Sequence, residues 1–210
     1  MTRKFPAILA GVSLVVLSAC SPSPKVTTEA ETKPAEPAAP PVPIPAKTAF
    51  WEMYKSARNW TTDFVILKVA SKEVPGYKNE AGKAAMWEVT FASPTKQEYR
   101  TYTYAIAAAP PDIYKGVVVG SPTPWSGTYS RDAMPIQISE FSIDSDAAYQ
   151  AAAEDAAAWL KKNPDKKLSP IELSNPARFQ VPTWFFMWGD KKSGYAGFVN
   201  ATTGKVVKHK

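Results

Sequence analysis

The stretch from Asp146 to Lys162, DAAYQAAAEDAAAWLKK, is the clearest helix signal in the chain. Its apolar residues recur three and four positions apart, which is typical of a helix with one buried face. Asp144 or Ser145 can cap its start, and Asn163-Pro164 ends it. An irregular strand over 167–173, an aromatic strand over 182–188 and a further strand over 195–200 follow. A helix followed by antiparallel strands predicts an α+β fold.

The first half of the folded region has a similar order of elements. A helix is expected over 48–59 with Thr48 as its N-cap, followed by strands over 63–69, 86–92 and 98–107. In the strand over 86–92, the residues Trp87, Val89 and Phe91 alternate with polar ones, so they predict a buried face. Both halves thus read helix, strand, strand, strand, which indicates a diverged tandem repeat. Unrelated α+β domains can also show this order.

The two predicted units meet in a proline-rich connection. We expect a loop over 108–135 with a short strand at 117–119, and then a strand over 136–143 before the second helix. The predicted boundaries are 48–135 for the first α+β unit with its connecting loop and 136–210 for the second.

The N-terminus carries a targeting signal. Arg3 and Lys4 precede an uncharged run over 5–19, which is short for a spanning helix and predicts a signal peptide over 1–19. The sequence from Leu17 to Cys20, LSAC, resembles the lipobox of bacterial lipoproteins. The resemblance implies lipidation of the Cys20 thiol, cleavage before Cys20, and acylation of the new amino terminus by a fatty acid such as palmitate. The alternatives are an ordinary secretory signal with a chance cysteine and a transmembrane anchor.

A spacer follows the lipidated cysteine. Residues 20–47 are predicted to be a disordered tether, because eight of the 27 residues over 21–47 are proline and none is aromatic. The expected location is the bacterial cell envelope, lipid-anchored and facing the periplasm or the exterior. Ser21 after the cysteine slightly favours the outer membrane.

The C-terminal half resembles a known family. A helix, an aromatic strand, a turn and then YAGFVNATTGKVV over 195–207 are similar to the end of a PepSY domain, and the motif falls on Asn200 to Val206. Such domains are small non-catalytic modules, often extracytoplasmic, and associated with peptidase propeptides or proposed to modulate peptidases. The resemblance implies two PepSY/cystatin-like units, each a helix packed on an antiparallel β-sheet.

The composition limits the chemistry. With 1 Cys and 1 His, the chain cannot build a disulfide framework or a Cys/His zinc site, and it has no phosphate-binding glycine loop. We expect no metal, no cofactor and no enzymatic activity, with a carboxylate-based hydrolase as the remaining enzymatic alternative. The net charge of +6 indicates an ordinary solubilising surface, or attraction to anionic envelope surfaces. An exported protein is not expected to bind nucleic acid.

The aromatic strand has apolar residues on both of its faces. One interpretation is a central strand covered on both sides; the other is a hydrophobic groove for a peptide or a lipid. The residues expected to line such a groove are Trp125, Tyr129, Trp184, Phe186 and Trp188. The sequence therefore predicts an envelope lipoprotein that binds a protein or peptide and could modulate a peptidase. A carrier or sensor of a small apolar ligand is the alternative.

Overall fold

The computed structural model describes residues 40–127 and 134–208, which lie in one compact unit of the chain. The elements in chain order are α1 (Ala46–Arg58), β1 (Val65–Lys72), β2 (Met86–Ser93), β3 (Glu98–Ala105), β4 (Gly116–Val119), β5 (Thr123–Pro124), the 3₁₀ helix η1 (Ile138–Glu140), α2 (Ser145–Asp155), α3 (Ala157–Lys162), β6 (Glu172–Ser174), β7 (Thr183–Trp188) and β8 (Tyr195–Asn200).

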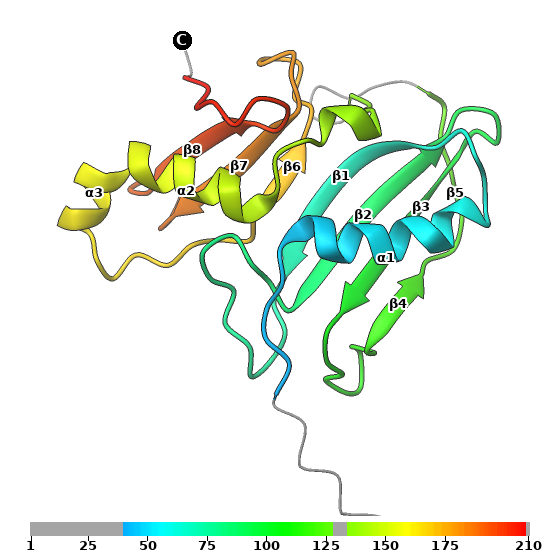
Figure 1. Cartoon of the computed structure of the whole chain (residues 1–210), viewed down its shortest axis with the longest axis horizontal. Helices are drawn as coiled ribbons and strands as arrows, with labels where there is room; N and C mark the ends of the chain where they lie inside the picture. The colour runs from blue at the N-terminus through cyan, green and yellow to red at the C-terminus, as the bar shows by residue number, and fades with distance from the viewer. Residues whose placement is uncertain (1–39, 128–133, 209–210) are drawn as a thin grey trace, which may run out of the picture. The chain divides into compact units, whose positions relative to one another are not determined.

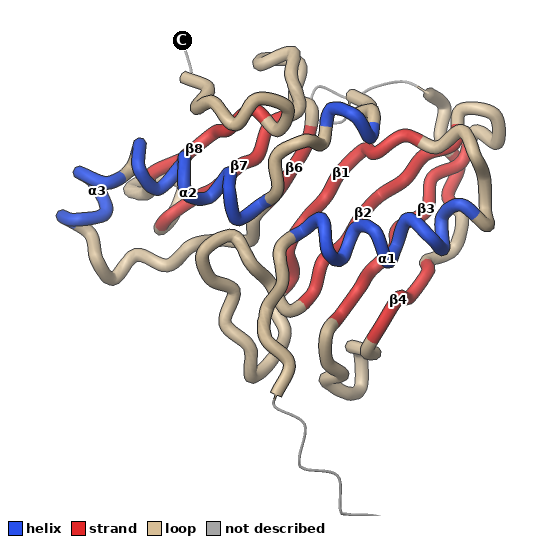
Figure 2. The backbone as a smooth tube through the Cα atoms, in the orientation of Figure 1, coloured by secondary structure: helices blue, strands red, loops and turns tan. Residues whose placement is uncertain are grey.

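The strands form one antiparallel sheet, in the order β4-β3-β2-β1-β6-β7-β8, with β5 beside β3. The first half of the fold supplies β1 to β5 and the second half β6 to β8. The two halves join where β1 pairs with β6, and helices α1 and α2 lie on the same face of the sheet (Figures 1 and 2). The predicted α+β class is thus confirmed, with the halves sharing one sheet.

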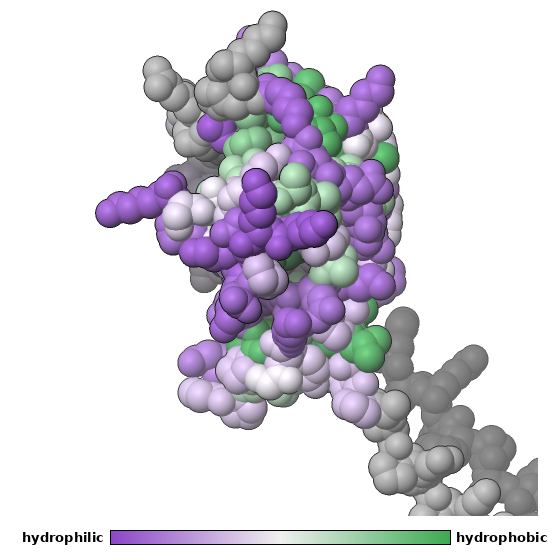
Figure 3. All heavy atoms as spheres, turned by 90° about the vertical axis from the view of Figure 1, so that its left-hand side faces the viewer, coloured by the Kyte–Doolittle hydropathy of each residue, from purple (hydrophilic) through white to green (hydrophobic). Residues whose placement is uncertain are grey.

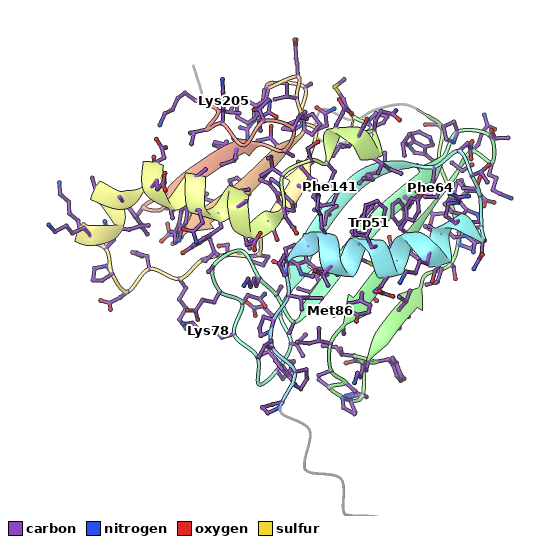
Figure 4. The ribbon with its side chains drawn as sticks, viewed as in Figure 1. Trp51, Phe64, Lys78, Met86, Phe141 and Lys205 are labelled. Carbon is purple, nitrogen blue, oxygen red and sulfur yellow. The ribbon has the colours of Figure 1, made fainter. Side chains whose placement is uncertain are left out.

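The core lies between this sheet and the helices. Trp87, Val89 and Phe91 are fully buried, as the alternation in the sequence predicts. Phe50 of α1 lies 5.6 Å from Phe91 and 5.3 Å from Phe141 between ring centroids, and Trp87 lies 6.4 Å from Trp184. Phe64 and Phe141 belong to this core, whereas Trp51 of α1 is 46% exposed (Figure 4). Aromatic contacts therefore connect the cores of the two halves.

One hydrogen bond occurs in the same place in both halves. The indole Nε1 of Trp87 in β2 donates to the carbonyl of Ile44 at 2.9 Å, just before α1 begins. The indole Nε1 of Trp184 in β7 donates to the carbonyl of Ile143 at 3.0 Å, just before α2 begins. In each half the bond ties the strand to the start of its helix.

The N-termini of α1 and α2 meet. The Asp144 carboxylate oxygen Oδ1 accepts hydrogen bonds from the backbone N–H groups of Ser145 and Lys47, at 2.7 and 2.9 Å. The Ser145 hydroxyl also accepts from the N–H of Ala46 at 2.8 Å. A carboxylate is favourable at the positive end of a helix dipole, and here one carboxylate serves two helices.

Several predicted boundaries were wrong, and each has a local reason. Helix α1 begins at Ala46, before Thr48, because Asp144 and Ser145 cap it from the other half. The helix expected over 146–162 is interrupted at Ala156, where the N–H of Trp159 donates to the carbonyl of Ala156 three residues back. The hydroxyl of Tyr195 donates to the Asp155 carboxylate at 2.6 Å beside this break.

The two connecting strands also differ from expectation. The strand expected over 136–143 is a single bridge between Ile136 and Ile66, after which the chain turns into η1. The strand expected over 167–173 is shortened to β6, because Pro170 has no N–H to donate. The short strand expected at 117–119 is confirmed as β4.

The other face of the sheet is not covered by α1 or α2. Charged pairs cross it, with Lys68 Nζ at 2.5 Å from Glu172 and Lys72 Nζ at 2.9 Å from Glu88. Antiparallel sheets commonly carry such a polar face opposite the core.

Candidate ligand-binding cleft

A cleft of about 950 Å³ opens where β1 and β6 diverge. One wall is the loop after β1, residues 73–81, and the other is the connection from α3 to β6, residues 164–170. Tyr149 of α2 and Trp188 of β7 form its floor. The volume lies within the range of about 300 to 1,000 Å³ that is usual for ligand sites.

The cleft exists because the pairing of β1 with β6 is short. The N–H of Ser71 donates to the carbonyl of Ile171 at 2.9 Å, and the N–H of Ile171 donates back to the Ser71 hydroxyl at 2.8 Å. The next residue outward on the β6 side is Pro170, which cannot continue the ladder. From this point the segment after β1 and the segment before β6 separate.

The first wall is held rigidly. The Asn79 side-chain amide donates to the carbonyl of Lys72 at 3.1 Å and accepts from the N–H of Ala85 at 3.4 Å, so it closes the loop on itself. Val74 is buried in a small cluster with Ala85 and Ile106. At the end of the loop Gly82 packs directly on the backbone of Ser145 and Asp146, where a side chain would not fit.

The second wall is fixed to β7. The N–H of Gly189 donates to the carbonyl of Lys167 at 2.9 Å, and the N–H of Ser169 donates to the carbonyl of Met187 at 2.8 Å. Pro164 and Pro170 limit the backbone at both ends of the segment. Both walls are therefore formed before any ligand arrives.

The floor of the cleft is aromatic and has one free hydroxyl. Trp188 is 3% exposed, and its ring centroid lies 5.9 Å from that of Tyr149. Within residues 40–127 and 134–208, no hydrogen bond to the half-buried Tyr149 hydroxyl is found. This floor can bury an apolar group and can hydrogen-bond a polar atom beside it.

The rim carries charges of both signs. Lys78 pairs with Glu80 at 3.1 Å and lies on the side of its loop that is nearer to the α3–β6 connection (Figure 4). The exposed charges Glu73, Lys166 and Lys167 have no ion pair in the described part of the chain. Hydrophilic side chains surround small apolar areas on this side of the molecule (Figure 3).

Apart from Tyr102, the groups with shifted pKa values hold parts of the fold together. Burial would raise the pKa of Asp63, but hydrogen bonds from Thr61, Thr95 and Ser93 outweigh it and hold the pKa well below the usual range. Lys208 and Tyr195 donate to Asp155 and lower its pKa.

Two further shifts lie on β8 and the turn before it. The hydrogen bond to Asp155 raises the pKa of Tyr195 to about 12. The backbone N–H groups of Ser193 and Lys192 lower the pKa of Asp190 in the turn between β7 and β8. No group of three or more His, Cys, Asp or Glu side chains that could hold a metal occurs in the described ranges.

Of the predicted groove residues, Trp188 alone is seen to line the cleft among those that the structure describes. Trp184 and Phe186 are fully buried beneath α2, so the prediction that they line a groove was wrong, and they are core residues. Trp188 contributes the floor of the cleft. Trp125 packs on a separate cluster of Val65, Leu67, Ala92 and Tyr99. Tyr129 and the predicted lipidation site Cys20 lie outside the described residues.

Most residues of the cleft were not predicted as site residues. The sequence periodicity places Tyr149 on the apolar face of its helix, and the loops fall in stretches that predict turns. The sequence indicates the two wall loops only through their prolines. Pro75 lies in the first loop, and Pro164 and Pro170 lie at the ends of the second. Nothing in the sequence shows that these loops, about 90 positions apart, face each other.

Comparisons with known proteins add little to this description. No protein-family model and no curated protein matches the chain. A candidate lipoprotein from Clostridium difficile 630 is similar in structure, with a TM-score of 0.49 and 13% sequence identity over 80% of this chain and 91% of that chain. At this TM-score the likeness carries no conclusion, so the lipobox and the PepSY resemblance stay predictions.

Gly82→Ala should destabilise the protein by about 3 kcal/mol or more, because the new Cβ would overlap the Ser145 backbone at a residue that already has a left-handed φ of +81°. Gly76→Ala is the matched control. Gly76 lies in the same loop with φ +84° and has open space within 4 Å of the position that a Cβ would take, so only the backbone strain of about 1 kcal/mol is expected. Urea denaturation measures both. Equal losses in the free energy of unfolding would show that the close packing of Gly82 on the start of α2 does not stabilise the fold.

Proposed function

We propose that this protein is a lipid-anchored lipoprotein of the bacterial cell envelope that binds an extended peptide segment of a partner protein in the cleft. The observation that carries the proposal is the preformed cleft of about 950 Å³ between two fixed loops. The lipobox-like sequence and the proline-rich tether support the location. In this account the tether holds the fold away from the bilayer, with Ser21 favouring the outer membrane.

The lining of the cleft favours a peptide over other ligands. A peptide presents apolar side chains, backbone donors and acceptors, and charges of both signs. The Tyr149–Trp188 floor suits an apolar side chain, the free Tyr149 hydroxyl suits a backbone group, and the rim offers Glu73 opposite Lys166 and Lys167. The partner segment should therefore carry a basic residue towards Glu73 and an acidic residue towards the lysines.

A carrier of a small apolar ligand is the second candidate. The aromatic floor is the observation that favours it, since Trp188 and Tyr149 could cover a ring or a short acyl chain. The charged and polar residues on both walls favour the peptide instead.

We also propose that the two halves are diverged PepSY/cystatin-like units. Support comes from the matching Trp87–Ile44 and Trp184–Ile143 hydrogen bonds and from the equivalent positions of α1 and α2. With such an origin the protein would act by binding, without catalysis or a cofactor, and could modulate an envelope peptidase. Across the described residues, the helices include none that is both long and apolar enough to cross a bilayer.

Cys20→Ser should abolish labelling of the protein by radioactive palmitate in growing cells and release the protein from the membrane fraction, because the serine hydroxyl does not replace the thiol as the lipid acceptor. Ser18→Ala, which keeps a small residue within the LSAC motif, is the control and should still be labelled. Palmitate incorporation into the Cys20→Ser variant would refute the lipid anchor.

The binding site can be tested by photo-crosslinking in intact cells. A photoreactive phenylalanine analogue at Tyr77 on the cleft wall should give one discrete adduct, whose partner peptide is identified by mass spectrometry. The same substitution at Tyr114, a tyrosine that is 66% exposed and does not line the cleft, is the control and should not give that adduct.

A blocking variant completes the experiment. Ser169→Arg places a large side chain in the cleft and should remove the Tyr77 adduct without unfolding the protein. If Tyr77 and Tyr114 give the same adducts, or if Ser169→Arg leaves the Tyr77 adduct unchanged, the cleft is not the partner site.

A further inference from the structure

Three buried polar atoms lack a partner in one small region of the fold. They are the indole Nε1 of Trp60, the Nε of Arg100 and the hydroxyl of Tyr102. No described residue forms an ion pair or a hydrogen bond with the Arg100 guanidinium, whose charge is therefore uncompensated within residues 40–127 and 134–208. Leaving a buried donor unsatisfied costs roughly 1 to 3 kcal/mol, and more for a charged group. Each such atom requires a partner, which can be water, an ion or a ligand.

Arg100 lies between the other two side chains, near the C-terminal end of α1. Arg100 and Tyr102 are two residues apart on β3, so they share one face of the sheet, and they lie opposite Phe91 and Val89 of the core. Trp60 follows α1, and the Arg100 guanidinium lies 5.1 Å from the centre of its ring. The region is thus built from α1 and β3, at the opposite end of the strands from the cleft.

The neighbouring edge of the sheet is interrupted beside Arg100. Strand β4 pairs with β3 up to Tyr102, and the N–H of Gly120 then donates to the carbonyl of Thr101 at 2.8 Å. Strand β5 pairs with β3 again at Tyr99 and Glu98, so β4 and β5 follow one another along the same side of β3 (Figure 1). The exposed segment 120–122 spans the gap between them. Arg100 and Trp60 are only half-buried, so solvent reaches part of both side chains, whereas Tyr102 is fully buried beside them.

The chemistry of the three groups is that of donors. Trp60 Nε1 and the guanidinium can only donate, and the Tyr102 hydroxyl can donate as well. Burial raises the pKa of Tyr102, so its hydroxyl stays protonated at neutral pH even with Arg100 nearby. The carboxylate of Asp63 is already engaged by Thr61, Ser93 and Thr95 and does not compensate Arg100.

We propose that Trp60, Arg100 and Tyr102 form a binding site for a small oxyanion, a carboxylate or a phosphate. A planar guanidinium binds either group with two parallel hydrogen bonds, and the indole and the phenol supply donors beside it. The face of the Trp60 ring keeps the guanidinium in place. Water could satisfy these donors as well, and an anion adds the opposite charge that the half-buried guanidinium lacks in the described part of the chain. This site is independent of the proposed peptide cleft.

The test measures the thermal stability of the full-length lipoprotein in detergent with added sodium acetate or sodium phosphate, at an ionic strength held constant with sodium chloride. A bound anion stabilises the folded state by mass action, so the Tm should rise with the concentration of at least one of the two anions. Arg100→Gln should abolish the rise. Arg58→Gln, which removes an exposed arginine of α1, should retain it.

Two variants that keep an aromatic ring distinguish a loss of anion binding from a folding defect. Trp60→Phe and Tyr102→Phe each delete one donor and keep an aromatic ring, and each should raise the anion concentration needed for half of the Tm rise by about three- to tenfold. A rise with acetate alone assigns a carboxylate ligand, and a rise with phosphate alone assigns a phosphate. No rise above chloride, or an equal rise in wild type and Arg100→Gln, would overturn the proposal.

Discussion

The antiparallel pairing of β1 with β6 is the interaction on which the rest of the structure depends. It joins the two halves into one sheet through the pairs Val69–Leu173 and Ala70–Glu172, and through the reciprocal bonds of Ser71 with Ile171. On the helix side the same junction is closed by Asp144, which binds the N-termini of both α1 and α2. Each half alone would leave the β1 or β6 edge of its sheet unpaired, and α1 would lose the groups that cap it.

The limits of this junction create the cleft. Because Pro170 stops the pairing, the loop over 73–81 and the segment over 164–170 separate and form the walls of the cleft. The aromatic floor lies between them. The anchoring of Gly82 on α2 and of Lys167 on β7 then keeps the walls apart. The feature that joins the halves thus also determines where the cleft lies.

Local patterns in the sequence predicted most of the fold. The alternation of Trp87, Val89 and Phe91, the turns at glycine and proline, and the cap at Asp144 all act within a few residues, so they can be recognised one at a time. The start of α1 could not be predicted, because its capping groups lie 99 and 97 positions away. The contact of Tyr195 with Asp155 beside the helix break likewise joins residues 40 positions apart.

The candidate site was harder to predict for the same reason. A run such as TWFFMW shows that many aromatic residues are present but not which face a helix will cover. The structure buries Trp184 and Phe186 beneath α2 and leaves Phe185 and Met187 half-buried on the other face. The cleft and the Trp60–Arg100–Tyr102 group each combine elements that are distant in the sequence. Only a fold that places β1 beside β6, and α1 over β3, brings them together.

Native-state hydrogen exchange tests most directly whether the two halves form one cooperative unit. The amide of Ser71, which donates across the junction, and the amides of β2 and β7 should all exchange only through global unfolding, with the same opening free energy and the same urea dependence. A lower opening free energy for β7 and β8 than for β2 and β3, with Ser71 exchanging early, would contradict the account and show two halves that unfold separately.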